Sequence, residues 1–244
     1  MSAALDFAAT EELLLRATFR DHRPLWYSSN YVYLCQLSDD DDRVFAAVYK
    51  PQRGENPLWD FPDGALYRRE VAAYRFSQLL GWGFIPPTVV RDGPEGIGSL
   101  QLFISHDQDS HFFTQRDQPE LLPQLKRMAV FDFITNNADR KGGHCLLDAH
   151  SQVWGIDHGL CFHAQYKMRT VMWDWVDEPI PAEWLEDIAS AAAALRSKSE
   201  SAAGVIELLA PAEIRALLGR IEQLLEAKTF PKPGPQRSHP WPLV

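Results

Sequence analysis

The chain has 244 residues, of which 45% are hydrophobic and 23% are charged. This composition predicts a packed protein of one large domain or two small lobes, and it excludes a disordered or collagen-like chain. With 24 Lys and Arg against 33 Asp and Glu, the net charge is −9, which disfavours general binding to nucleic acid. No run of about 18 apolar residues predicts a transmembrane segment, and residues 1–10 carry no secretory leader. We therefore expect a cytoplasmic protein.

The first part of the chain is predicted to be rich in strands. Residues 31–37 and 44–50 consist largely of β-branched and aromatic side chains, and the acidic run 38–42 separates them. Two such segments around a polar turn predict an antiparallel hairpin.

A helix and two more strands are expected next. After a loop rich in Pro and Gly, residues 65–80 carry apolar side chains at helical spacing, which predicts an amphipathic helix. Residues 85–90 and 98–105 have the composition of short strands.

The second half of the chain has a helical character. Residues 121–135 predict a strongly apolar helix, and the polar segment 136–143 follows it. The apolar runs 145–147 and 153–156 predict a short hairpin. Two further helices are expected at the following positions: 182–196 and 211–228.

This order of elements predicts an α+β chain in two lobes. Residues 1–104 would form a small antiparallel β lobe with one helix, and residues 105–230 a larger, mainly helical lobe. Residues 231–244 hold five of the 17 prolines and are expected to form an extended or loose tail.

Lys50 and Glu70 have the positions that a phosphate-binding pair requires. Lys50 ends an apolar strand, and Glu70 lies 20 residues further on, in the middle of the predicted helix. An ammonium that holds a nucleotide phosphate needs a fixed counter-charge, which a carboxylate on an adjoining helix can provide. Taken alone, the same two residues also fit an exposed lysine and an exposed glutamate.

The polar loop between the apolar helix and the following strand carries the strongest signal. It contains Asp139, Arg140, Lys141 and His144, and its framing by apolar elements places these side chains at the edge of a rigid core. Asp139 can take the proton from an acceptor hydroxyl, and Lys141 can reach a transferring phosphate. Asp139, Lys141 and Arg140 are therefore the candidate catalytic residues, although an ordinary polar turn has a similar composition.

Asp157 is the candidate metal ligand. It follows a predicted strand, precedes His158 and Gly159, and lies 18 residues after Asp139. Mg²⁺ is commonly bound by one or two carboxylates together with water and phosphate oxygens. An aspartate that only caps a turn would occupy the same position.

The order of these motifs resembles the protein kinase-like superfamily. The segment Asn137 to His144 is similar to the Asp-Arg-His-x-x-Asn catalytic loop of its atypical branch, which contains phosphatidylinositol 3- and 4-kinases and HipA-type bacterial kinases. The segment 156–159 resembles the Ile-Asp-Phe-Gly metal motif of that branch. Over residues 17 to about 230, the chain resembles actinobacterial proteins that are similar to phosphatidylinositol 3- and 4-kinases.

The resemblance implies a bilobal kinase-like fold and an ATP-dependent kinase that uses Mg²⁺. It places Lys50 on the α- and β-phosphates with Glu70 as its partner, Asp139 as catalytic base and Asp157 on the metal. The connection between the lobes would offer backbone groups of Phe103 and Ile104 to the adenine.

Two departures from the family pattern affect the expected site. The family's glycine-rich phosphate loop has no Gly-x-Gly here, and Ser28, Ser29 and Asn30 would replace the glycine amides as hydrogen-bond donors. His144 stands where the branch has a metal-binding Asn, and imidazole is a poorer ligand for Mg²⁺ than an amide oxygen. Three alternatives follow from this departure. His144 contacts phosphate or substrate, or it is a metal ligand and the site prefers Mn²⁺, or the activity is weak.

Other functions fit parts of the sequence. A zinc site built from His and Cys residues is disfavoured, because these residues show none of the usual paired spacings.

The acceptor is an unidentified hydroxyl, and residues 173–178 follow the metal motif where kinases place acceptor-selecting segments. The acidic composition gives no support for a membrane-facing acceptor, so a small molecule or a protein is expected instead of a lipid. A pseudokinase or nucleotide-sensing module without phosphoryl transfer is the alternative.

Overall fold

The computed structural model describes residues 5–25 and 30–244, and a five-stranded antiparallel sheet forms its N-terminal part. The order of its strands is β1-β2-β3-β5-β4, so β3 is the central strand. The strands are β1 (Thr18–Pro24), β2 (Tyr33–Ser38), β3 (Val44–Pro51), β4 (Thr88–Gly93) and β5 (Gly96–Leu102). The predicted hairpin corresponds to β2 and β3, whereas β1 was not predicted as a separate strand because Phe19 is its one large apolar side chain and four consecutive polar residues follow it.

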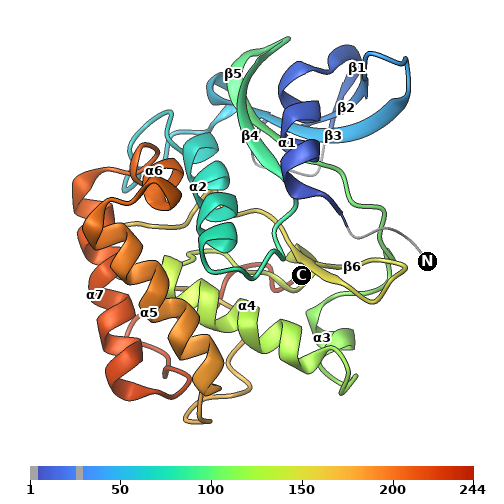
Figure 1. The fold of residues 1–244 in the computed structure, drawn as a ribbon. Coiled ribbons are helices and arrows are strands. Elements are labelled where there is room, and N and C mark those ends of the chain that lie inside the picture. The colour runs from blue at the N-terminus through green and yellow to red at the C-terminus, as the bar shows by residue number, and fades with distance from the viewer. Residues whose placement is uncertain (1–4, 26–29) are drawn as a thin grey trace.

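Most of the helices lie below the sheet in Figure 1, whereas α1 lies beside its strands. The α-helices are α1 (Phe7–Arg16), α2 (Leu66–Leu79), α3 (Phe112–Gln115), α4 (Leu122–Thr135), α5 (Ala182–Ser197), α6 (Ala203–Ile206) and α7 (Pro211–Ala227). The 3-10 turns are η1 (Gln52–Gly54), η2 (Gly142–His144) and η3 (Glu200–Ala202), and a small hairpin is formed by β6 (Cys145–Leu147) and β7 (Val153–Gly155). The four long helices that begin after residue 60 all match the sequence prediction within two residues.

Helix α1 is the main element that the sequence analysis did not predict. Asp6 caps it by accepting a hydrogen bond from the Ala9 amide, and Leu14 packs into the core of the sheet beside Leu37 and Leu100. An aspartate directly before a helix is a common capping signal, so this start was readable from the sequence. The small lobe therefore has two helices, where one was expected.

The largest apolar core joins α2 to the C-terminal helices, and the sheet packs around a separate core that contains Leu37 and Leu100. Residues of α2, including Phe76, pack in the same cluster as residues of α4, α5 and α7. The ring of Phe76 lies 5.7 Å from that of Phe131 and 6.3 Å from that of Phe162, measured between centroids. Helix α2 thus belongs to the N-terminal part by sequence but is packed against the C-terminal helices.

The expected bilobal α+β architecture is confirmed by this arrangement. The boundary at residues 104/105 stays a prediction, because the apolar core does not stop there. Within the described ranges, no helix combines the length and the apolar character needed to cross a membrane.

Because α2 packs against β4 and β5 as well as in the core of the C-terminal helices, Phe76→Ala should destabilise the whole molecule in one step. Phe76 is fully buried, and truncating such a ring costs about 3–5 kcal/mol of the free energy of unfolding. Urea unfolding followed by far-UV circular dichroism and by tryptophan fluorescence would give coincident transitions at a lower midpoint. The control Leu15→Ala, at a half-exposed position of α1, should change stability by less than about 0.5 kcal/mol. Two separate transitions would show that α2 does not couple the sheet to the C-terminal helices.

Candidate active site

Four of the predicted charged residues line one cavity between the sheet and the helical part. Lys50, Glu70, Asp139 and Asp157 face a space of about 170 Å³. They come from β3, α2, the loop after α4 and the loop after β7, respectively. The fold therefore brings together side chains that are up to 107 residues apart in the sequence.

Lys50 stands at the centre of this cluster. It lies near the end of the central strand β3, where its main chain pairs with Ser99 of β5. Its Nζ contacts Glu70 Oε1 and donates a hydrogen bond of 2.8 Å to Asp157 Oδ1. The other carboxylate oxygen of Glu70 accepts a 2.9 Å hydrogen bond from the backbone N–H of His158. Three separate elements are tied together at this point.

The charges of this cluster shift one another's pKa values. Burial would lower the pKa of Lys50, but the carboxylates of Asp157 and Glu70 outweigh burial and raise it. Lys50 in turn holds the pKa of Asp157 well below its usual range. Burial raises the pKa of Glu70 against the opposing effect of Lys50. Lys50 and Asp157 are consequently a fully charged pair at neutral pH.

Asp157 is held in an unusual backbone conformation that exposes its carboxylate. Its φ is 61°, in the left-handed region that side chains other than Gly, Asn and Asp seldom adopt. The side chain remains 47% exposed, in contrast to 4% for Glu70. Such strain is often found at functional sites, where neighbouring contacts fix one conformation.

The loop after α4 presents Asp139 to the same cavity. Helix α4 ends at Asn136, whose φ of 56° and ψ of 49° turn the chain sharply. The side chain of Asn137 then accepts a 3.0 Å hydrogen bond from the Asp139 amide. Burial raises the pKa of Asp139, and Lys141, whose Nζ lies 3.2 Å from Asp139 Oδ2, opposes this rise. Asp139 and Lys141 are therefore adjacent at the edge of the cavity.

Arg140 does not face the cavity, which corrects its prediction as a catalytic residue. Its side chain is fully buried, and it makes two hydrogen bonds of 2.8 and 2.9 Å to the carboxylate of Asp132 in α4. It also donates to the carbonyl of Ile156 at 2.9 Å and contacts His158 Nε2 at 2.7 Å. Arg140 is thus a positioning residue that joins the loop of Asp139 to the loop of Asp157.

His144 contacts Asp157 and is poorly placed to bind a metal in this arrangement. Burial lowers its pKa to about 4, so the imidazole is neutral at pH 7. Its Nδ1 lies 3.4 Å from the backbone N–H of Lys141, and its Nε2 lies 3.3 Å from Asp157 Oδ2. A neutral ring that accepts at Nδ1 carries its proton on Nε2, which then donates to Asp157. In this tautomer the Nε2 lone pair is not available to a cation.

The carboxylates that remain fit a cation whose other ligands are phosphate oxygens and water. Among the described residues, no group of three or more His, Cys, Asp or Glu side chains is arranged to hold a metal. Asp157 offers an exposed carboxylate, and Asp139 lines the same cavity. Mg²⁺ and similar cations take one or two protein carboxylates together with phosphate oxygens and water, which agrees with this arrangement.

Comparison with known proteins supports a kinase-like fold. The family model described as phosphatidylinositol 3- and 4-kinase matches residues 90–212. Protein Rv2133c of Mycobacterium tuberculosis is 42% identical over 249 residues, which cover 88% of each chain. The chain belongs to the phosphatidylinositol 3- and 4-kinase family. Phosphatidylinositol 4-kinase gamma 4 of Arabidopsis thaliana is 29% identical over 52% of this chain and 27% of its own length.

A solved structure extends this likeness to the fold of the whole chain. The Golgi casein kinase with Mn/ADP bound matches with a TM-score of 0.58 and 12% identity, over 91% of this chain and 75% of that one. At this level of identity the comparison shows a shared bilobal kinase fold. The protein is accordingly a kinase-like member of its family.

Other residues predicted to bind the nucleotide differ in their outcome. Asn30 lines the cavity of this family member, whereas Ser28 and Ser29 lie outside the described residues. Phe103 and Ile104 line a different cavity, beside the turn between β6 and β7. The Phe103 amide donates to the carbonyl of Ala46 at 3.1 Å, so this group is already used in the sheet. Their contact with adenine stays a prediction.

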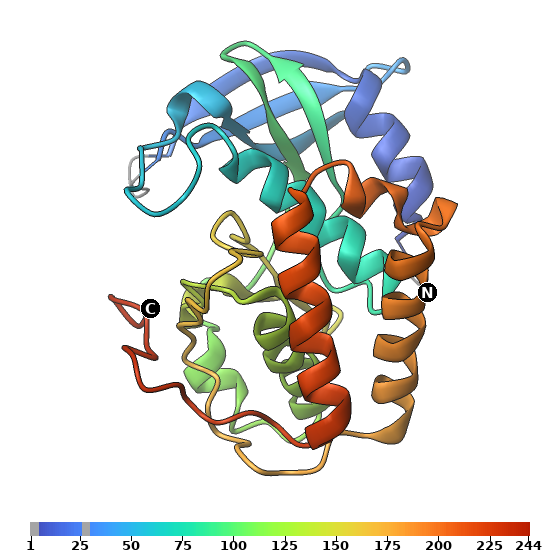
Figure 2. The same ribbon diagram turned by 90° about the vertical axis from the view of Figure 1, so that its left-hand side faces the viewer.

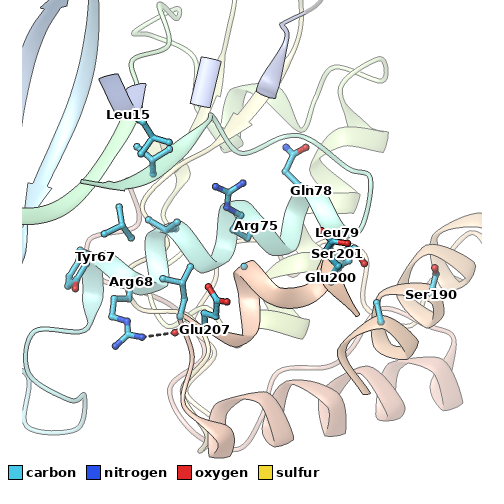
Figure 3. Close-up of a pocket in the computed structure, with 16 residues that line it drawn as sticks. Leu15, Tyr67, Arg68, Arg75, Gln78, Leu79, Ser190, Glu200, Ser201 and Glu207 are labelled. Atoms are coloured by element: carbon cyan, nitrogen blue, oxygen red, sulfur yellow. Dashed lines mark hydrogen bonds between the residues drawn. The ribbon is translucent and has the colours of Figure 1, made fainter. Parts of the chain in front are cut away.

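The kinase domain has a larger cavity on the other side of α2. It has a volume of about 1000 Å³ and is lined by Arg68, Arg75 and Gln78 of α2 together with Glu200 and Glu207 (Figure 3). Of the predicted catalytic and nucleotide-binding residues that the structure describes, none lines it. The choice of candidate site therefore rests on the convergence of charged groups and not on the volume of the cavity.

The sequence analysis missed two residues on which the site depends. Asp132 is a lone carboxylate in the apolar run of α4. A buried charge is normally paired, so this residue was a signal in the sequence for a buried cationic partner. Glu55 lies in the loop rich in Pro and Gly, and its carboxylate accepts hydrogen bonds from the Leu66 and Tyr67 amides at 3.0 and 2.8 Å. It thereby caps α2 from a distance, and no local spacing indicates such a contact.

The assignment of Arg140 as a positioning residue is tested by Arg140→Met. Removing one partner of a buried ion pair leaves Asp132 uncompensated and should cost about 3–5 kcal/mol of the free energy of unfolding. The double variant Arg140→Met with Asp132→Leu should recover most of that loss, because two apolar side chains replace the pair. Chemical denaturation measures both variants. Unchanged stability in Arg140→Met would contradict the positioning role.

Proposed function

We propose that the protein is an ATP-dependent phosphotransferase that transfers the γ-phosphate of ATP to a hydroxyl of a small molecule or a protein. The observation that carries this proposal is the single cavity onto which Lys50, Glu70, Asp139 and Asp157 converge. Phosphoryl transfer requires a cation for the nucleotide phosphates, a carboxylate for the metal and a base near the acceptor. The four side chains supply these groups within one space.

Each residue has a defined role in the proposed reaction. Lys50, fixed by Glu70, binds the α- and β-phosphates. Asp139 orients the acceptor hydroxyl and accepts its proton as the acceptor oxygen forms a bond to the γ-phosphorus. The bond between that phosphorus and the β-γ bridging oxygen breaks, and ADP leaves. Lys141, next to Asp139, stabilises the negative charge of the phosphate in transit.

Asp157 would hold the divalent cation, Mg²⁺ or Mn²⁺. When bound, this cation neutralises charge on the nucleotide phosphates. We assign His144 to the orientation of Asp157, through the contact between its Nε2 and Asp157 Oδ2. This assignment replaces the metal-ligand role that the family pattern implied for His144.

The composition favours an acceptor other than a lipid headgroup. The net charge is −9 and the pI of the sequence is about 5.3. A protein that works on an anionic membrane surface would be expected to carry a basic patch facing the lipid. A small-molecule or protein hydroxyl is therefore the acceptor class that we propose.

Asp139→Asn tests the proposed reaction directly. The amide cannot accept the proton, so the rate of phosphate transfer should fall by about 10²–10⁴-fold. The affinity for ATP should stay within about threefold of the wild type, because Lys50 and Asp157 are unchanged. ADP formation and calorimetric titration with ATP and Mg²⁺ or Mn²⁺ measure the two quantities. The control is Asp117→Asn, an exposed aspartate outside the cavity.

Two results would contradict this assignment. Full activity in Asp139→Asn would remove Asp139 from its role as base. Binding of ATP by the wild type without turnover under either metal would support the alternative, a pseudokinase or nucleotide-sensing module.

A further inference from the structure

Residues 231–244, which we call the tail, run back across the helical part and end at the catalytic loop (Figure 2). The carbonyl of Leu243 accepts a 2.7 Å hydrogen bond from the backbone N–H of Gly142, three residues after Asp139. The carbonyl of Ser238 accepts two hydrogen bonds of 3.0 Å, from the Thr170 amide and from Trp173 Nε1. The tail is thus hydrogen-bonded directly to the catalytic loop and to the segment that contains Thr170 and Trp173.

The groups that bind the tail belong to the catalytic loop and to the segment 170–173. Residues 169–171 pair with the catalytic loop, since the Arg140 amide donates to the Arg169 carbonyl at 2.9 Å and the Val171 amide to the Arg140 carbonyl at 3.1 Å. The tail contacts both members of this pair, through the amides of Gly142 and Thr170. No tail residue lines the cavity of Lys50 and Asp157. The tail therefore covers the loop of the base while the proposed nucleotide cavity stays open.

The tail is held mainly by its backbone. Trp241, Leu243 and Val244 remain 77%, 40% and 56% exposed, so these apolar side chains contribute little packing. Pro240 is the one buried side chain among residues 235–244. A segment with few buried apolar contacts opens at low free-energy cost. Binding through carbonyls also means that another peptide could take the same place, as in other cases of main-chain recognition.

We propose that Gly142, Thr170 and Trp173 form a peptide-binding surface for the acceptor, and that residues 236–244 occupy it as an intramolecular peptide. The acceptor is then a polypeptide that binds when the tail is displaced. This inference rests on the proposed function and narrows its acceptor class. The tail acts as a built-in competitor, because it uses the same backbone donors that the acceptor needs.

The test uses two variants of the full chain that differ only in where a charge is added. Pro240→Glu places a charge at the buried position and should release the tail, whereas Pro235→Glu changes an exposed proline of the same segment. Hydrogen exchange should show loss of protection at the Gly142 and Thr170 amides in Pro240→Glu only. Thermal unfolding of both variants should match the wild type.

A synthetic peptide of residues 231–244 probes the surface without any need for catalysis. It should bind Pro240→Glu at least about tenfold more tightly than it binds the wild type or Pro235→Glu, in which the surface is covered. Adding Trp173→Phe to Pro240→Glu removes one donor to the peptide and should weaken its binding by about fivefold. The same change in the otherwise wild-type chain should reduce protection of the Thr170 amide.

Dephosphorylated casein with ATP and Mn²⁺ then tests the acceptor class. Pro240→Glu should phosphorylate casein at least about fivefold faster than the wild type, and the tail peptide should inhibit this reaction but not ATP hydrolysis. Equal casein rates in the two chains, or no binding of the peptide to Pro240→Glu, would overturn the proposal.

Two further outcomes separate this inference from the proposed function. Unchanged protection in both Pro240→Glu and Trp173→Phe would show that these contacts do not hold the tail, and would also overturn the proposal. Absence of ATP turnover in every variant would contradict the proposed function and the acceptor assignment with it. The binding of the peptide would still decide whether the surface recognises a polypeptide.

Discussion

The site depends on the contact of one lysine with two carboxylates. Lys50 comes from the central strand, Glu70 from the helix beneath the sheet and Asp157 from the loop after the small hairpin. Burial lowers the pKa of Lys50, and the carboxylates of Asp157 and Glu70 outweigh burial and raise it, so the ammonium stays charged. The sheet, α2 and the loop of Asp157 are therefore fixed relative to one another by charge as well as by packing. A phosphate that enters the cavity would meet an ammonium that is already in position.

A second ion pair, between Arg140 and Asp132, lies next to the contacts of Lys50 and fixes the loop of Asp157. Arg140 and Asp132 are both fully buried, and Arg140 also binds the backbone of the Asp157 loop. The two pairs differ in exposure, since Lys50 and Asp157 reach the cavity and Arg140 does not. Exposed charges adjacent to a rigid buried pair are the arrangement expected of a preorganised site. Residues next to each other in the sequence, such as Asp139 and Arg140, can thus have entirely different functions.

Local patterns predicted the elements well but not their long-range contacts. The helical spacing of 65–80 and the apolar run of 121–135 gave α2 and α4 almost to the residue, since each pattern reflects one buried face. The convergence of Lys50, Asp139 and Asp157 followed from the order of motifs and the family resemblance. The burial of Arg140, the cap from Glu55 and the contact between Leu243 and Gly142 join residues far apart or depend on side-chain direction, which spacing does not reveal.

The most direct test of the central claim is a crystal structure of the full chain with a non-hydrolysable ATP analogue and Mn²⁺. The account predicts that the phosphates lie in the cavity with an oxygen in contact with Lys50 Nζ. It also predicts a Mn²⁺ ion bound by Asp157, with the terminal phosphate directed toward Asp139. A nucleotide bound in the larger cavity behind α2, or a metal ion held without Asp157, would contradict it.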